Sequence, residues 1–146
     1  MFCGAGRPPN TTGVFLMSRA VAQAMIDGGG GRIITLASAS STVANPNYAA
    51  YAASKSALIG LTRVLALEYA RKNVTVNAIG PAVIRTPMSE KFLQDDAYAR
   101  AALDKIQMGR FSTPEDLIGT AILLASAAGA FITGQIIYVD GGRTLS

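Results

Sequence analysis

The chain has 146 residues, of which half are hydrophobic and only 15% are charged, so it can form one globular domain with a core and is not a disordered chain. Its net charge of +4 comes from scattered Lys and Arg side chains without a basic run, so no nucleic-acid surface is predicted. Histidine is absent and Cys3 is the single cysteine, so neither a metal site nor an intrachain disulfide is predicted, and a reducing, cytoplasmic setting is expected.

The first half of the chain alternates helical and extended patterns. Residues 11–27 form a predicted helix, and a glycine run at 28–31 ends it in a loop. A short β-branched run at 32–38 predicts a buried strand, and a long helix is expected over 48–71. The apolar side chains that share one stripe of the first helix are Val14, Met17, Val21 and Met25.

The second half continues the alternation. A second strand is predicted at 74–79, followed by an irregular loop at 80–86 and a polar helical stretch at 88–108 that resembles a substrate lid. "STPEDL" predicts a helix start with Thr113 as N-cap and Pro114 at the first position. That helix ends near Gly129, and a third strand is predicted at 135–139 before a Gly-Gly turn.

No stretch of the sequence has the features of a membrane segment. The apolar run "TAILLASAAGAFI" at 120–132 is shorter than the roughly 20 residues that a spanning helix needs. The opening "MFCGAGRPPN" lacks the apolar core of a signal peptide. The sequence therefore predicts neither a membrane partner nor a leader.

Short apolar strands that alternate with helices predict βαβ units, that is, an α/β fold with a parallel sheet covered on both faces. In such sheets ligands bind beyond the carboxyl ends of the strands. Those ends are Ser38, the loop 80–86 and Gly141–Gly142.

Tyr51 and Lys55 lie one helical turn apart within the long predicted helix, so their side chains share a face. A nearby ammonium favours the phenolate, and a phenol in that position is an effective general acid and base for a carbonyl and alcohol pair. Ser38, at the end of the preceding strand, can hydrogen-bond the same oxygen. The alternative is an exposed tyrosine and a solvated lysine.

Several segments together resemble the short-chain dehydrogenase/reductase family. "YAASK" at 51–55 resembles its Tyr-x-x-x-Lys motif, and Ser38 precedes Tyr51 by 13 residues, the spacing of the family's catalytic serine. "NTTGVF" resembles the segment with the family's catalytic asparagine. "VNAIGPAVIRTPM" resembles its nicotinamide loop, and "GRFSTPEDL" and "ITGQIIYVDGG" resemble its closing helix and last strand.

The resemblance implies a catalytic role for four residues. Tyr51 would give or take the proton, Lys55 would favour the phenolate and bind the nicotinamide ribose, Ser38 would position the substrate oxygen, and Asn10 would hold a water of a proton relay. It also implies NAD or NADP as the cofactor, and a small alcohol or ketone, sugar-type or ketoacyl-type, as the substrate. The residues implied in cofactor binding are Tyr51, Lys55, Pro81, Ala82, Ile84 and Thr86.

Three further residues are predicted to line the substrate pocket: Ser40, Tyr48 and Met88. Tyr48 lies about one turn before Tyr51, so it faces either the same cleft or the packing at the helix start. Both interpretations stay open from the sequence.

The sequence departs from the family in two respects. The family's Pro-Gly is Pro81-Ala82 here, which predicts a weakened cofactor contact because glycine allows closer backbone approach. A pyrophosphate turn lies between a strand and the helix that follows it. "CGAGR" at 3–7 follows no predicted strand, and the glycines 28–31 lie between a helix and a strand, so neither is read as that turn. The resemblance thus implies one domain over 1–146, a partial Rossmann-like doubly wound sheet of three strands without the nucleotide-binding half.

That partial sheet has consequences for association. The strand 32–38 would expose an open apolar edge, and helices 11–27 and 48–71 would carry surplus apolar side chains, which predicts a homo-oligomer through these helices. The candidates for the surplus are Leu58, Leu61, Val64 and Leu65. The choice between NAD and NADP is not predicted, because the residues that decide it follow a strand of the other half.

Two other functions compete with the oxidoreductase. A non-catalytic module that associates through its helices would have the same sequence pattern but would not bind a cofactor. A serine hydrolase that uses Ser38 is disfavoured, because the chain has no histidine and "LASAS" lacks the glycines of a nucleophile elbow.

Overall fold

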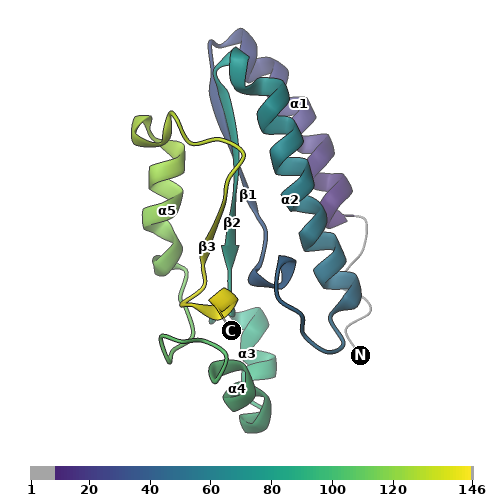
Figure 1. Ribbon diagram of the computed structural model, residues 1–146, viewed down its shortest axis with the longest axis vertical. Coiled ribbons are helices and arrows are strands. Elements are labelled where there is room, and N and C mark those ends of the chain that lie inside the picture. The colour runs from purple at the N-terminus through teal and green to yellow at the C-terminus, as the bar shows by residue number, and fades with distance from the viewer. Residues whose placement is uncertain (1–8, 146) are drawn as a thin grey trace.

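The computed structural model describes residues 9–145, which form a three-stranded parallel sheet with helices on both faces (Figure 1). The strands lie in the order β1 (Gly31–Leu36), β2 (Val74–Pro81), β3 (Ile136–Val139). The predicted α/β fold class and its parallel sheet are confirmed. Cys3 and the segment 3–7 lie outside the described residues.

The helices are divided between the two faces and one end of the sheet. α1 (Val14–Asp27) and α2 (Ala49–Tyr69) cover one face, and α5 (Glu115–Ala125) covers the other (Figure 1). α3 (Pro87–Leu93) and α4 (Asp96–Leu103) lie beyond the carboxyl ends of the strands, where the predicted 88–108 stretch divides into two short helices.

β2 is the central strand, and all eight of its residues are buried. Its neighbours pair with it in parallel, for example Ile33 with Val76 and Ala78 with Ile136. A parallel strand covered on both faces accommodates a nearly continuous apolar run, and the sequence 74–81 has that character. The polar exceptions are Thr75 and Asn77. The Asn77 side chain donates to the Ile132 carbonyl at 2.7 Å and accepts from the Gln135 amide at 3.0 Å.

The main hydrophobic cluster lies between the sheet and the two helices α1 and α2. Its buried members are Ile33, Leu65, Ala66, Val74 and Val76. Leu58 and Leu65 are almost fully buried, so the expectation that they are surplus is wrong, whereas Val64 is exposed. In α1 the buried positions are Ser18 and Ala22. Of the predicted stripe, Val21 and Met25 pack against this cluster, whereas Met17 is 65% exposed.

Several boundaries differ from the predictions by one or two residues. The strand predicted at 32–38 covers Gly31–Leu36, so Ser38 follows the strand rather than closing it. The start of α5 is also shifted: the N-cap is Pro114, not Thr113, and the Thr113 amide donates to the Asp116 carboxylate at 2.9 Å. This bond ties the residue before the helix to the first turn, as the acidic residue of a capping box does.

The outer edge of β1 is open in the described part of the chain, because β1 pairs with β2 alone, as β3 does at the other edge. Leu36, at the end of β1, is 57% exposed.

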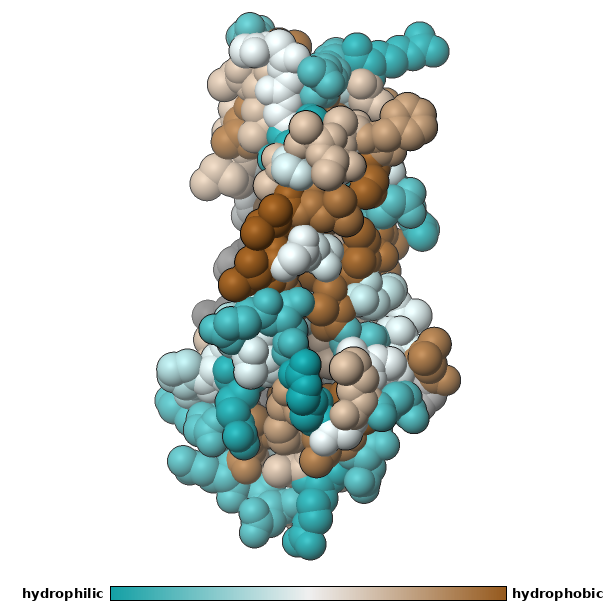
Figure 2. Space-filling model, turned by 90° about the vertical axis from the view of Figure 1, so that its left-hand side faces the viewer, coloured by the Kyte–Doolittle hydropathy of each residue, from teal (hydrophilic) through white to brown (hydrophobic). Residues whose placement is uncertain are grey.

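Figure 2, which faces the side of α5, shows apolar surface gathered across the middle of the molecule. Large apolar side chains that α5 exposes are Ile118, Ile122 and Leu123.

Candidate active site

A cavity of about 510 Å³ lies at the carboxyl end of the sheet, bordered by the segment after β1, the start of α2, the loop after β2, and helices α3 and α4. Open α/β sheets bind their ligands at this end of the strands. The cavity brings together eight residues that the sequence predicts for the site: Ser38, Ser40, Tyr48, Tyr51, Ala82, Ile84, Thr86 and Met88.

Ser38 is held in place by the end of β1 and the turn that follows. The Ala37 amide donates to the Ile79 carbonyl at 2.8 Å, which continues the pairing with β2 for one residue beyond the strand. Ser38 is extended and buried, and its Oγ accepts a 3.2 Å hydrogen bond from the Ser40 amide. The backbone position of Ser38 is therefore fixed by the strand pairing before it and by the short helical turn after it, and its side chain lines the cavity.

Two tyrosines from the start of α2 form one wall of the cavity. The rings of Tyr48 and Tyr51 meet edge to face, with centroids 5.9 Å apart and an interplanar angle of 86°. The Tyr48 hydroxyl lies 2.9 Å from the hydroxyl of Tyr98 on α4. Burial, followed by this hydrogen bond, raises the pKa of Tyr48, so its phenol stays protonated. Tyr48 thus serves both interpretations left open by the sequence: it packs at the helix start and it lines the cavity.

Lys55 lies one turn beyond Tyr51 and reaches back toward β1. Its Nζ donates to the Leu36 carbonyl at 2.7 Å and lies 5.9 Å from the centroid of the Tyr51 ring. Burial lowers the pKa of Lys55. Lys55 lines a second cavity, of about 500 Å³, which runs along β1 and α1, so α2 borders both cavities through side chains one turn apart.

Asn10 also lines this second cavity, from the short helical turn before α1. Its Nδ2 donates to the Ser54 Oγ at 3.3 Å, and that hydroxyl donates to the Tyr51 carbonyl at 2.7 Å. Two hydrogen bonds therefore connect Asn10 to the turn of α2 that carries Tyr51 and Lys55. The structure places Asn10 beside Lys55 rather than in the cavity that contains Ser38.

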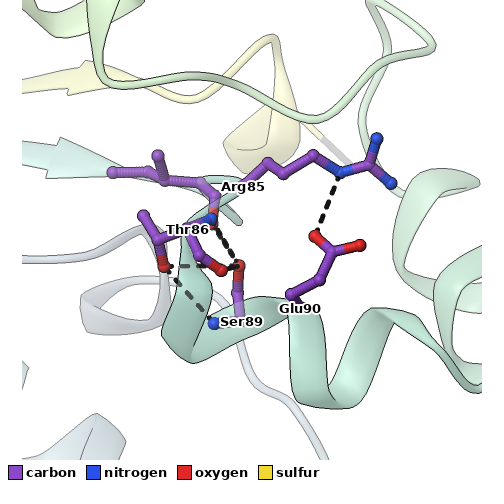
Figure 3. A network of polar contacts seen from close by, with 5 residues as sticks. Arg85, Thr86, Ser89 and Glu90 are labelled. Carbon is purple, nitrogen blue, oxygen red and sulfur yellow. Dashed lines mark hydrogen bonds and ion pairs between the residues drawn. The ribbon is translucent and has the colours of Figure 1, made fainter.

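The loop after β2 is fixed by a capping box at the start of α3 (Figure 3). The Ser89 amide donates to Thr86 Oγ1 at 3.3 Å, and the Thr86 amide donates to Ser89 Oγ at 2.9 Å. The same Ser89 hydroxyl lies 2.7 Å from the Ile84 carbonyl, to which it donates. Arg85 points outward toward Glu90 at 3.5 Å, an exposed ion pair.

The backbone groups of Ile84 face away from Ser112, the residue with which it forms a β-bridge. Its neighbours face Ser112, because the Ser112 amide donates to the Val83 carbonyl and the Arg85 amide donates to the Ser112 carbonyl. Since backbone groups alternate in an extended segment, the Ile84 amide and carbonyl face the opposite side. On that side the Ile84 carbonyl accepts from the Ser89 hydroxyl at 2.7 Å, and Ile84 and Thr86 both line the cavity.

Pro81 and Ala82 differ in their placement. Pro81 is the last residue of β2, buried and paired with Val139. Ala82 comes directly after it and lines the cavity, so its methyl group stands where the family's glycine would leave the backbone bare. Ala82 therefore borders the cavity directly. Pro81 does not line it and can affect a bound ligand only by fixing the position of Ala82.

Sequence reasoning did not single out several residues of the cavity wall, among them Asn45, Phe92, Tyr98, Lys105 and Arg143. Arg143 directly follows Gly141–Gly142, which the sequence already placed at the carboxyl end of a strand. Its position next to the ligand site could therefore have been predicted. Tyr98 and Phe92 belong to the two helices over the cavity, and nothing in the local pattern indicates which side chains of such helices face inward.

Comparisons with known proteins agree with this geometry. Residues 9–144 match the family model described as enoyl-(acyl carrier protein) reductase. The chain is 42% identical over 134 residues to 2-dehydro-3-deoxy-D-gluconate 5-dehydrogenase of Dickeya dadantii, which covers 91% of this chain and 53% of that protein. The chain belongs to the short-chain dehydrogenase/reductase family.

Other members of the short-chain dehydrogenase/reductase family show the same relationship. NAD-dependent glycerol dehydrogenase of Listeria innocua is 40% identical over 93% of this chain and 53% of its own length. The crystal structure of gluconate 5-dehydrogenase from Burkholderia cenocepacia, in complex with NADP and tartrate, superposes with a TM-score of 0.90 at 37% identity, over 94% of this chain and 54% of that one. The chain spans about half the length of the curated relatives it matches.

A membrane-spanning helix is not found among residues 9–145, because none of their helices is both long and apolar enough to cross a bilayer.

Proposed function

We propose that this chain carries the catalytic part of an NAD(P)-dependent oxidoreductase that interconverts a small alcohol and a ketone. The observation that supports the proposal best is the convergence of Ser38 and Tyr51 on one cavity at the carboxyl edge of the sheet, with Lys55 one turn away. The relatives' names include both neutral polyols and sugar acids, so a small polyhydroxylated substrate is the proposed class.

In the direction of reduction, Tyr51 donates its phenolic proton to the oxygen of the substrate carbonyl while Ser38 hydrogen-bonds the same oxygen. The hydride to the carbonyl carbon would come from NADH or NADPH when one of them is bound. Lys55 would bind the ribose next to the nicotinamide from the second cavity. Asn10 supports that turn of α2 through Ser54 and would position a water that returns the proton to Tyr51.

The nicotinamide end of the cofactor would lie against the loop after β2. The Ile84 backbone would meet the carboxamide, and Thr86 would add its hydroxyl, which the capping box with Ser89 holds in place. Ala82 would border this contact, and Pro81 would hold Ala82 in place from the end of β2. Ser40, Tyr48 and Met88 would line the substrate side of the cavity.

A fluorescence titration with NADH and NADPH tests the proposal. Saturable binding is expected for the wild-type chain, and Lys55→Ala is expected to abolish it. Lys72→Ala is a matched control. The Lys72 Nζ also lies near a tyrosine ring, 6.0 Å from the Tyr69 centroid, but Lys72 lines neither cavity. A folded chain that binds neither nucleotide would contradict cofactor binding by residues 9–145, and equal losses in the two variants would contradict the role of Lys55.

A second candidate function is a non-catalytic module that self-associates through α1 and α2. The exposed apolar side chains on these helices favour it, namely Leu16, Met17, Val64 and Leu67. Sedimentation analysis of Leu67→Lys against the wild type tests the association. The homo-oligomer, the single domain over 1–146 and the cytoplasmic location stay predictions, and the nucleotide titration separates the two functions.

A further inference from the structure

Three tyrosines line the cavity that contains Ser38, and they come from two elements that are far apart in the sequence. Tyr48 and Tyr51 belong to the start of α2, and Tyr98 belongs to α4. Of the three, only Tyr51 has a chemical step in the proposed reaction. Tyr48 contacts both of the others, Tyr98 through its hydroxyl and Tyr51 through its ring.

The backbone of Tyr48 is fixed by the turn that precedes α2. Its amide donates to the Asn45 carbonyl at 3.2 Å, which closes a four-residue turn with Pro46 and Asn47 at the central positions. Asn47 has a φ of +66°, and a proline followed by a residue with positive φ is typical of a type II turn. On the helix side, the Tyr48 carbonyl accepts from the Ala52 amide at 2.7 Å. The point from which the Tyr48 ring projects into the cavity wall is therefore defined.

The ring of Tyr48 packs directly against the ring of Tyr51. The two centroids lie 5.9 Å apart at an interplanar angle of 86°, so the edge of one ring meets the face of the other. Aromatic pairs favour this geometry, because a positive ring edge then faces a negative π surface. A change of the Tyr51 side-chain rotamer would break this contact. The contact therefore restricts where the Tyr51 hydroxyl lies.

The far end of Tyr48 is held by α4. Its hydroxyl lies 2.9 Å from the hydroxyl of Tyr98. The Tyr98 amide donates to the Asp95 carboxylate at 3.1 Å, and the Tyr98 ring packs against Phe92 of α3 with centroids 6.4 Å apart. Tyr98 is thus fixed within the pair of helices beyond the strand ends. Tyr48 connects this pair of helices to Tyr51.

A second acid and base is the alternative role for Tyr48, and two observations disfavour it. The Tyr48 hydroxyl is engaged with that of Tyr98. Burial, followed by this hydrogen bond, raises the pKa of Tyr48, and negative charge on Tyr51 raises it further. Tyr48 therefore keeps its proton when Tyr51 gives up its own, and the two phenols do not compete.

We propose that Tyr48 is a positioning residue for Tyr51: its ring holds the Tyr51 side chain in one rotamer at the cavity wall, and its hydroxyl makes that orientation depend on α4 through Tyr98. The inference rests on the proposed function, because it takes Tyr51 as the acid and base. A misplacement of about 1 Å at the reacting groups can cost about 10²-fold in rate, so the packing of the proton donor is a requirement of the reaction.

NMR spectroscopy of the full chain with isotope-labelled tyrosine tests the inference without turnover. Three-bond couplings to Cγ report the χ1 rotamer of Tyr51, and ring line shapes report its flip rate. We expect one rotamer and slow flips in the wild type. Tyr48→Leu removes the ring contact, so it should mix the Tyr51 rotamers and accelerate the flips several-fold. Tyr48→Phe restores the ring and should restore the single rotamer.

Tyr48→Phe and Tyr98→Phe test the connection with α4. Each variant removes one of the two hydroxyls of the 2.9 Å contact, so both should accelerate the Tyr51 flips to the same extent, and the double variant should add nothing further. Tyr69→Phe is the matched control, because Tyr69 is the last residue of α2 and lines neither cavity. It should leave the Tyr51 signals unchanged.

The Tyr69 ring in the same spectra separates positioning from general loosening of the chain. Its flip rate should stay constant in every Tyr48 and Tyr98 variant. Equal acceleration of both rings, an unchanged Tyr51 in a folded Tyr48→Leu, or unchanged or additive effects in the phenylalanine variants would overturn the inference. If Tyr48→Leu does not fold, the phenylalanine variants, which keep every ring, decide.

This experiment and the nucleotide titration fail independently, because the spectra require no nucleotide. Nucleotide binding with an unchanged Tyr51 leaves the proposed function in place and removes the role of Tyr48. The expected changes at Tyr51 without nucleotide binding have the opposite meaning.

Discussion

The ammonium of Lys55 donates a 2.7 Å hydrogen bond to the carbonyl of Leu36, so the helix that carries the proposed acid and base is tied to the end of β1. Lys55 is partly buried, and this carbonyl gives its ammonium an acceptor. Burial, rather than this contact, lowers the pKa of Lys55, and this gives the stability of the chain a pH dependence that can be measured.

The first prediction concerns the pH dependence of stability. Burial lowers the pKa of Lys55 in the folded state below its ordinary value of 10.5, so the folded chain holds this proton less tightly than the unfolded chain does. The resulting penalty is present at neutral pH and is relieved as the pH rises from the folded pKa toward 10.5. Urea unfolding should therefore show the wild type gaining stability relative to Lys55→Met over this interval. A difference that does not change with pH would contradict the prediction, and Lys72→Met is the control.

The second prediction concerns the contact between Tyr48 and Tyr98. Tyr98→Phe removes the 2.9 Å hydroxyl contact but keeps the ring that packs against Phe92, with centroids 6.4 Å apart. Ultraviolet titration should show that the pKa of Tyr48 decreases but stays above that of an ordinary tyrosine, because burial is the larger cause of its rise. Amide exchange in α4 should become faster. An unchanged titration would mean that the two hydroxyls do not interact in solution.

The third prediction compares two polar side chains of β2. Asn77→Ala leaves the Ile132 carbonyl and the Gln135 amide without their partner, and should cost about 1–3 kcal/mol of unfolding free energy. Thr75→Val replaces a buried hydroxyl that has no partner among the described residues, so it should be neutral or stabilising. Urea unfolding measures both changes. Similar losses in the two variants would show that burial alone, rather than the hydrogen bonds of Asn77, decides the effect.

The fourth prediction concerns Gly80, which lies in β2 against the ring of Tyr138. A Cβ at this position would lie 2.5 Å from Tyr138 Cδ1, so Gly80→Ala should destabilise the chain by about 1–3 kcal/mol. Tyr138 also bonds to Thr42 through its hydroxyl, which restricts its retreat. Thermal unfolding should show the opposite sign for Gly60→Ala, in the middle of α2, where nothing lies within 4 Å. That control should gain about 0.5–1 kcal/mol from helix propensity.

Periodicity and turn residues predicted the order and type of the main elements, because each strand is a short apolar run and the chain reverses at glycines. The position of Ser38, Tyr51 and Lys55 near one sheet edge also followed from the sequence, since parallel strands end at the same edge. Boundaries were less well predicted: α5 begins at Glu115 with Pro114 as its N-cap, although the Asp116 carboxylate still accepts from the Thr113 amide.

Contacts between distant segments could not be predicted. Tyr48 and Tyr98 are 50 residues apart, and Arg143 and Asn45 are 98 apart. Such pairs depend on how α4 and the last turn pack over the sheet, and local patterns do not contain that information. The division of the predicted catalytic residues between two cavities, with Lys55 and Asn10 in the second, has the same origin.

The open edge of β1 gives the strand two chemically different sides. The Gly31 and Ala37 amides donate to the Asn73 and Ile79 carbonyls of the β2 side, so by alternation the amides of residues 32, 34 and 36 face away from the sheet. Hydrogen exchange along this single strand should therefore alternate between slow and fast sites. A polypeptide that added to this edge would slow the fast sites together, and it would compete with the Lys55 ammonium for the Leu36 carbonyl, so the exchange pattern and the ionisation of one lysine would report the same event.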